Sequence, residues 1–87
     1  MSARLYVGNL STETSNDELN TLFSAVGQVE SCNLIIDRNT NRSKGFAFVE
    51  MISKEVADAA KAKLNGQDLH GQALKVDEAK PRNDSRN

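Results

Sequence analysis

Cysteine and histidine are nearly absent from this sequence, with one residue of each, Cys32 and His70. A lone cysteine cannot close an internal disulfide or supply a CxxC metal pair, and no metal or cofactor is expected. The histidine stands beside Gly71 in a turn-forming stretch, so we interpret it as a turn residue rather than a general base. A glycine-rich phosphate-binding loop is also missing, and the sequence therefore does not indicate an enzyme.

Long hydrophobic runs are missing as well. No apolar stretch follows the N-terminus that would serve as a signal peptide or a membrane span. With 38% hydrophobic and 26% charged residues, the composition is that of one small globular domain rather than a disordered chain. We therefore expect a soluble protein without membrane association, cytoplasmic, or nuclear if the organism is eukaryotic.

An excess of positive charge is absent too, because the formal net charge is −1. A non-specific nucleic-acid binder would be strongly basic, and this chain is not. The basic residues are nevertheless clustered, since Arg38, Arg42 and Lys44 fall within seven residues with no acid between them. Such a cluster is often only a solvated loop, so its meaning depends on what lies beside it.

Aromatic residues are few, with one tyrosine, three phenylalanines and no tryptophan. Two of them, Phe46 and Phe48, stand one position apart in the stretch KGFAFVEM. Successive side chains of a strand point to opposite faces, so Ala47, Val49 and Met51 share one face and the phenylalanines share the other. The aliphatic set is the natural core side. The phenylalanines are then exposed and mark an interaction site, unless a second layer covers both faces of the sheet.

The remaining pattern predicts four strands and two helices. The predicted ranges are strands at 4–9, 29–37, 44–51 and about 74–77, helices at 16–26 and 54–64, and a turn or small hairpin at 66–71. Ser15 and Glu18 have the capping-box form at a helix start, and Gly27 is expected to be left-handed after its end. The order β-α-β-β-α-β predicts an α+β sandwich, with a four-stranded antiparallel sheet and both helices on one face. Helices this short cover one face only, which leaves the face of the two phenylalanines bare.

Two stretches, LYVGNL at 5–10 and KGFAFVEM at 44–51, resemble the two short signatures of the RNA recognition motif family. The second fits every position of the family pattern except the last, where Met51 replaces an aromatic residue. The resemblance covers about residues 4–79 and is strongest to small single-motif proteins of the bacterial and glycine-rich type, without their glycine-rich tail. It implies a ferredoxin-like fold with an RNA recognition motif domain at 1–80, followed by a flexible polar tail at 81–87.

The resemblance also implies roles for individual residues. In the family, one aromatic residue from each signature stacks on a base and a third packs against the sugars, which here are Tyr6, Phe48 and Phe46 in that order. Lys44 corresponds to the family's phosphate contact. Further candidates around this face are Arg38 and Arg42 on the loop between the second and third strands, Asn33 and Ile35 on the second strand, and Lys75, Asp77, Glu78 and Lys80 near the end.

These observations predict a non-catalytic, monomeric protein that binds single-stranded RNA. Other RNA-bound proteins are expected as further partners. Glu50 and Asp77 are expected on the same face, where they would repel phosphate and keep the affinity modest. A protein-interaction module of the same family is one alternative, because some members bind peptides. Single-stranded DNA is another, because stacking does not sense the 2′-hydroxyl group.

Overall fold

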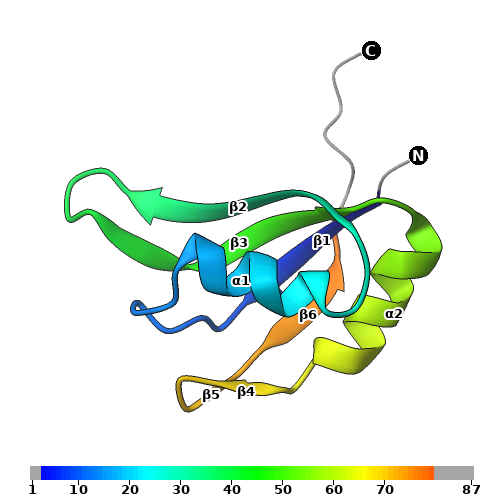
Figure 1. The fold of residues 1–87 in the computed structure, drawn as a ribbon. Helices are drawn as coiled ribbons and strands as arrows, with labels where there is room; N and C mark the ends of the chain where they lie inside the picture. The colour runs from blue at the N-terminus through cyan, green and yellow to red at the C-terminus, as the bar shows by residue number, and fades with distance from the viewer. Residues whose placement is uncertain (1–2, 80–87) are drawn as a thin grey trace.

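The computed structural model describes residues 3–79 of the chain (Figure 1). Its elements are β1 (Ala3–Gly8), α1 (Asn16–Ser24), β2 (Val29–Asp37), β3 (Arg42–Met51), α2 (Lys54–Leu64), β4 (Asp68–Leu69), β5 (Gln72–Ala73) and β6 (Lys75–Glu78). Four strands form one antiparallel sheet in the order β2-β3-β1-β6, and β4 and β5 form a separate small hairpin. The predicted architecture is confirmed. The predicted tail at 81–87 and Lys80 lie outside the described residues.

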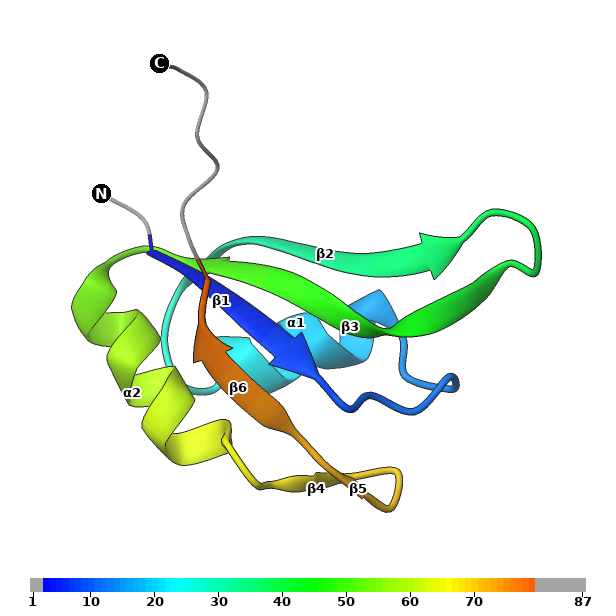
Figure 2. The same ribbon diagram turned by 180° about the vertical axis from the view of Figure 1, so that it is seen from behind.

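Both helices lie on the same face of the sheet. They stand in front of it in Figure 1 and behind it when the molecule is turned, as Figure 2 shows. The core fills the layer between the sheet and the helices, and its fully buried side chains from the sheet and α1 are Leu5, Val7, Leu19, Phe23, Ala47, Val49, Met51 and Val76. Helix α2 contributes Ala57, Ala60 and Leu64, and the two small alanine side chains let it approach the sheet closely. The inward face predicted for β3 is therefore confirmed.

Helix α1 begins as predicted but ends earlier. The Ser15 hydroxyl accepts a hydrogen bond from the Glu18 amide at 3.1 Å, and the Glu18 carboxylate accepts one from the Ser15 amide at 2.9 Å. These are the two bonds of a capping box. The helix ends at Ser24, and the prediction for Gly27 is wrong, because Gly27 is not among the residues with positive φ. A Cβ atom at Gly27 would lie 2.4 Å from Val56 Cγ1, so glycine is needed there for the close approach of α2.

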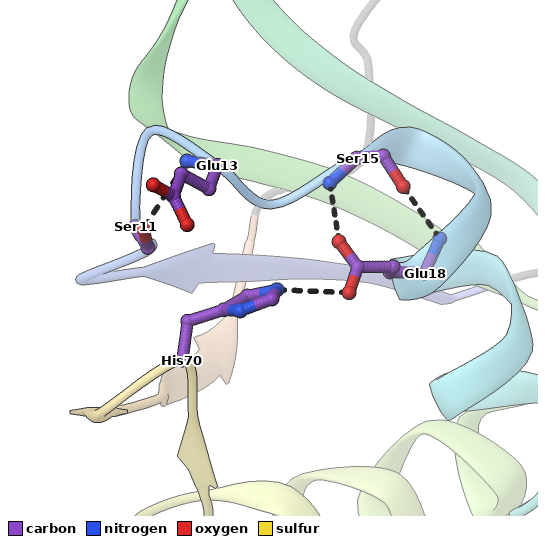
Figure 3. Close-up of polar contacts among 5 residues, drawn as sticks. All are labelled: Ser11, Glu13, Ser15, Glu18 and His70. Atoms are coloured by element: carbon purple, nitrogen blue, oxygen red, sulfur yellow. Dashed lines mark hydrogen bonds and ion pairs between the residues drawn. The ribbon is translucent and has the colours of Figure 1, made fainter.

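The β4–β5 hairpin is fastened to the start of α1. His70 and Gly71 form its turn with φ values of 55° and 81°, which confirms the interpretation of His70 as a turn residue. The Nε2 atom of His70 lies 2.8 Å from Oε2 of Glu18, while the other carboxylate oxygen of Glu18 accepts the capping bond (Figure 3). The Ser15 amide, followed by His70, lowers the pKa of Glu18. One carboxylate thus joins the helix cap to the hairpin.

Acid should weaken this connection. Because the pKa of Glu18 is lower in the folded chain than in the unfolded chain, folding favours the carboxylate. Its stabilising contribution is complete above the unfolded pKa and is lost as the pH falls through the lower folded pKa. We expect the urea midpoint to fall more for the wild type than for Glu18→Gln between about pH 6 and pH 3, since glutamine keeps the cap without the charge.

Glu13→Gln is the matched control for this measurement. Glu13 lies on the adjacent loop, and within residues 3–79 its carboxylate takes part in no ion pair (Figure 3). It should leave the acid-induced loss of stability unchanged. If Glu18→Gln lost as much stability on acidification as the wild type, the carboxylate would not be the group that responds to pH.

Candidate nucleic-acid interface

The sheet face opposite the helices carries three aromatic rings. Tyr6 on β1 is the cross-strand partner of Phe48 on β3, and Phe46 lies two residues from Phe48 on the same face. The ring centroids lie 5.9 to 6.0 Å apart in all three pairs. Tyr6 and Phe46 are inclined to each other by only 28°, whereas Phe48 meets Phe46 at 82°. We call Tyr6, Phe46 and Phe48 the aromatic platform, and each of its side chains is half-buried because the rings pack on one another.

Gly8 gives the Tyr6 ring its place on the platform. Both residues belong to β1 and lie on the same face, since they are two positions apart. A Cβ atom at Gly8 would lie 2.6 Å from the Tyr6 hydroxyl oxygen, which is closer than unbonded atoms approach. Any other residue would therefore push the ring away from this position. Gly8 was not predicted as a site residue, although its place two residues after Tyr6 on the same strand face indicated this contact.

An irregularity between β2 and β3 determines where the basic residues lie. Leu34 pairs with Ala47 and Ile36 pairs with Ser43, so β3 contains two more residues than β2 over this interval. Gly45 lies inside it with a φ of 92°, and its carbonyl accepts a hydrogen bond of 2.9 Å from the Leu10 amide. The bulge bends the strand where the platform begins, since Phe46 falls within the same interval. The alternation of side chains between the two sheet faces, predicted from position 44 onward, is therefore interrupted within this interval.

The basic cluster lies at one end of the platform. Arg38 is on the loop between β2 and β3, which projects at one end of the sheet in Figures 1 and 2. Asn41 is left-handed there, with a φ of 64°, as its type permits. The prediction that Arg42 lies on this loop is wrong, because Arg42 begins β3 and pairs with Asp37. Arg38, Arg42 and Lys44 are exposed, and in the part of the chain that the structure describes none of them takes part in an ion pair.

The other predicted site residues are only partly gathered at the platform. Asn33 pairs with Phe48 from β2, and Lys75 pairs with Gly8 from β6, so both flank the rings. Ile35 is half-buried and falls within the irregular interval of β2. Glu78 pairs with the buried Leu5, which places it on the helix side of the sheet edge rather than beside the rings.

Asp77 is on the platform side by register, because it pairs with Tyr6. Its carboxylate is held by other groups, since Oδ1 accepts a hydrogen bond from the Glu78 amide at 2.8 Å and lies 3.4 Å from Lys61 Nζ on α2. These two contacts lower the pKa of Asp77. Lys61 therefore neutralises part of the negative charge that the sequence placed near the platform.

Arg4 also lies on this face, and it was not predicted as a site residue. The guanidinium carbon of Arg4 lies 4.1 Å from the centroid of the Phe48 ring, in a cation–π contact. Arg4 is also the cross-strand partner of Glu50, whose Oε1 accepts a hydrogen bond of 2.9 Å from the Ser31 hydroxyl. Together with Asn33 and Phe48 these residues line a shallow hollow of about 80 Å³. The sequence spacing could have predicted this face for both residues. Arg4 stands two positions before Tyr6 and Ser31 two positions before Asn33, and residues two apart on a strand share a face.

Residues 3–79 contain no group of three or more His, Cys, Asp or Glu side chains that could hold a metal ion. Cys32 is half-buried on β2, and burial raises the pKa of its thiol, which disfavours the reactive thiolate. Neither helix is long and apolar enough to cross a membrane.

An open antiparallel sheet with helices behind it and an aromatic platform in front defines a class of single-domain binding proteins. The sequence profile of the RNA recognition motif matches residues 5–75. The chain therefore belongs to the RNA recognition motif family of RNA-binding proteins, which are binding proteins rather than enzymes.

Two relatives illustrate this membership. The chain is 46% identical over 78 residues to the putative RNA-binding protein RbpE of a Nostoc species, and this alignment covers 90% of this chain and 79% of that protein. It is 45% identical over 82 residues to glycine-rich RNA-binding protein 1 of Mycosarcoma maydis, which covers 94% of this chain but only 47% of that protein. The chain thus corresponds to most of the bacterial relative and to about half of the fungal one.

Solved structures agree with the fold. The crystal structure of RNA binding protein PG1 superposes with a TM-score of 0.88 at 39% identity, covering 94% of this chain and 99% of that one. The structure of the Rna15 RNA recognition motif with bound RNA (GU) superposes with a TM-score of 0.83 at 30% identity, covering 94% and 87% of the two chains. Similarity at this level confirms the predicted ferredoxin-like architecture and the predicted family.

Proposed function

We propose that this chain binds single-stranded RNA on the sheet face that carries the aromatic platform. The observation that supports this most is the placement of the three rings on two neighbouring central strands, opposite the helices. Aromatic rings on a sheet face that no helix covers add nothing to the core, and they match the flat faces of nucleobases. In this proposal Tyr6 and Phe48 each stack on one base, while Phe46 packs against the ribose between them.

Stacking and charge have separate tasks in this mechanism. Each stacked base contributes about 1–3 kcal/mol whatever its identity, because every base has a π-face. Lys44, Arg38 and Arg42 are exposed at one end of the platform, where they can neutralise phosphates. With a net charge of −1 the chain lacks the long-range attraction of a basic protein. We therefore expect modest affinity, with the RNA backbone following the side of the β2–β3 loop.

Family membership and the structure of a similar domain with bound RNA support RNA as the partner. In the proposal the chain acts as a monomer and requires no cofactor. Single-stranded DNA has the same stacking faces, and an RNA preference would have to come from contacts to the 2′-hydroxyl group. A peptide is the other candidate, and direct titration distinguishes the three.

The test is an NMR titration of the isotope-labelled chain with a degenerate single-stranded RNA hexamer, repeated with DNA of the same length. We expect the largest shifts at the platform residues and at Lys44, with larger shifts for RNA than for DNA. The amides of α1 and α2 on the opposite side should hardly move, and they serve as internal controls. The absence of shifts with either nucleic acid at low salt would contradict the proposal and leave a protein partner for the exposed rings.

A further inference from the structure

The hollow beside Phe48 is a built polar site. Its walls come from three neighbouring strands, with Arg4 on β1, Glu50 on β3, and Ser31 and Asn33 on β2. The registers bring them together, because Glu50 is the direct partner of both Arg4 and Ser31, and Asn33 is the partner of Phe48. A volume of about 80 Å³ is too small for a whole nucleobase but sufficient for the edge of one. A base lying on Phe48 can therefore direct one edge into this hollow.

The orientation of Glu50 is set by a neighbour. Its Oε1 atom accepts the Ser31 hydroxyl at 2.9 Å, while within residues 3–79 its Oε2 atom accepts no hydrogen bond. The side chain is only partly exposed, so its carboxylate is held at the wall of the hollow rather than extended into water. A carboxylate oxygen has two lone pairs, and both oxygens can still accept a hydrogen bond from a ligand. The site thus presents two parallel acceptors.

Arg4 presents the opposite chemistry. Its guanidinium group only donates hydrogen bonds, and it lies over the Phe48 ring, on which a base would stack. A base that takes this position displaces the guanidinium to the side of the ring. The displaced group stays within reach of the base edge, because Arg4 and Glu50 face each other across the two strands. A ligand for this hollow must therefore offer donors to Glu50 and an acceptor to Arg4 or Asn33.

Guanine is the base that meets this requirement. Its Watson–Crick edge carries two adjacent donors, the N1–H and the N2 amino group, beside the O6 acceptor. Uracil has one donor between two carbonyl oxygens that a carboxylate would repel, and adenine and cytosine each place an amino group next to an unprotonated ring nitrogen. Only guanine can donate two parallel hydrogen bonds to one carboxylate.

We propose that Glu50, oriented by Ser31 and assisted by Arg4, makes this domain prefer guanine at the base that stacks on Phe48. The inference rests on the proposed RNA binding and specifies it further. It also gives Glu50 a role other than the repulsion of phosphate. Stacking on Phe48 holds the base, and Glu50 selects it.

The experiment measures the affinity of the full chain for uridine hexamers that carry one central guanosine, adenosine, cytidine or inosine. We expect the guanosine hexamer to bind about tenfold more tightly than the adenosine or all-uridine hexamers. Inosine lacks the N2 amino group, so its hexamer should lose most of this advantage. Glu50→Gln should remove the preference, since an amide offers one acceptor and two donors where guanine needs two acceptors.

Glu55→Gln is the matched control, because it removes the same charge from an exposed position on α2, away from the platform. It should leave the preference for guanosine unchanged. If Glu50→Gln raised the affinity for every hexamer by the same factor, Glu50 would act only by repelling phosphate and the inference would be wrong. A wild type without preference for guanosine would overturn it as well.

The failure of this inference can be distinguished from that of the proposed function. If all hexamers bind with equal affinity and Phe48→Ala abolishes that binding, the platform binds RNA and the hollow does not select guanine. If Phe48→Ala changes no affinity, the platform itself is not the RNA-binding surface.

Discussion

Phe48→Ala should lower the affinity for short single-stranded RNA by about 5- to 150-fold, the loss expected from one stacked base. Phe48 contacts both of the other platform rings and also lines the polar hollow, so its removal takes away one of the two proposed stacking surfaces. Since the side chain is only half-buried on the face away from the helices, the fold should persist. Fluorescence anisotropy with a labelled RNA hexamer measures the affinity, and urea unfolding of the same sample checks the fold.

Two conservative variants show which property of the ring matters. Phe48→Tyr keeps a flat aromatic face and should retain most of the affinity. Phe48→Leu keeps an apolar side chain without a π-face, and it should bind nearly as weakly as the alanine variant. If the leucine variant bound like the wild type, hydrophobic contact rather than stacking would hold the base. An unchanged affinity in a folded Phe48→Ala protein would contradict the proposed RNA-binding mode.

Strand periodicity was sufficient to predict which aromatic side chains lie on the open sheet face rather than in the core. The alternation in KGFAFVEM separated Ala47, Val49 and Met51 from the two phenylalanines, and the structure places the aliphatic set at zero exposure. Local signals also predicted the capping box at Ser15 and the bounds of α2. These features depend on residues close together in the chain, so a sequence reader can recognise them. The site residues that follow from this alternation, Tyr6 and Asn33 among them, were predicted for the same reason.

Features that depend on contacts between distant segments were not predicted. Gly27 was interpreted as a helix-ending residue, but its role is set by Val56 on another helix. The partial neutralisation of Asp77 at the platform edge depends on an ion pair with Lys61, which joins β6 to α2. The hollow requires the register of three strands, including the shift between Val29 and Ser31 that brings Ser31 opposite Glu50. No local pattern encodes such a register.

The placement of the platform leaves the core with little aromatic surface. Of the four aromatic residues in the chain, only Phe23 is buried between the sheet and the helices. The other core residues are aliphatic, and many of those on α2 are alanine. A domain of this size is stabilised by about 4 to 12 kcal/mol. Its stability should therefore depend strongly on this one ring.

Phe23→Ala is expected to destabilise the domain by about 3–5 kcal/mol, because it combines the loss of a fully buried ring with a cavity that the surroundings fill only partly. Phe23 has zero exposure on α1, and the hydrogen bonds that its backbone carbonyl accepts from the Val26 and Gly27 amides remain possible in the alanine variant, so the expected loss comes from the ring alone. In urea unfolding at 25 °C the midpoint should fall steeply.

Ile52→Ala is the control for the size of this effect, because it also removes a large hydrophobic side chain but from a position that is 41% exposed. It should change the free energy of unfolding by no more than about 0.5 kcal/mol. Phe23→Leu should lie between the two, since leucine refills part of the cavity. If Phe23→Ala were as mild as Ile52→Ala, the core would be able to close around the missing ring. The placement of the other three aromatic rings on the platform would then not have made the stability of the core depend on Phe23.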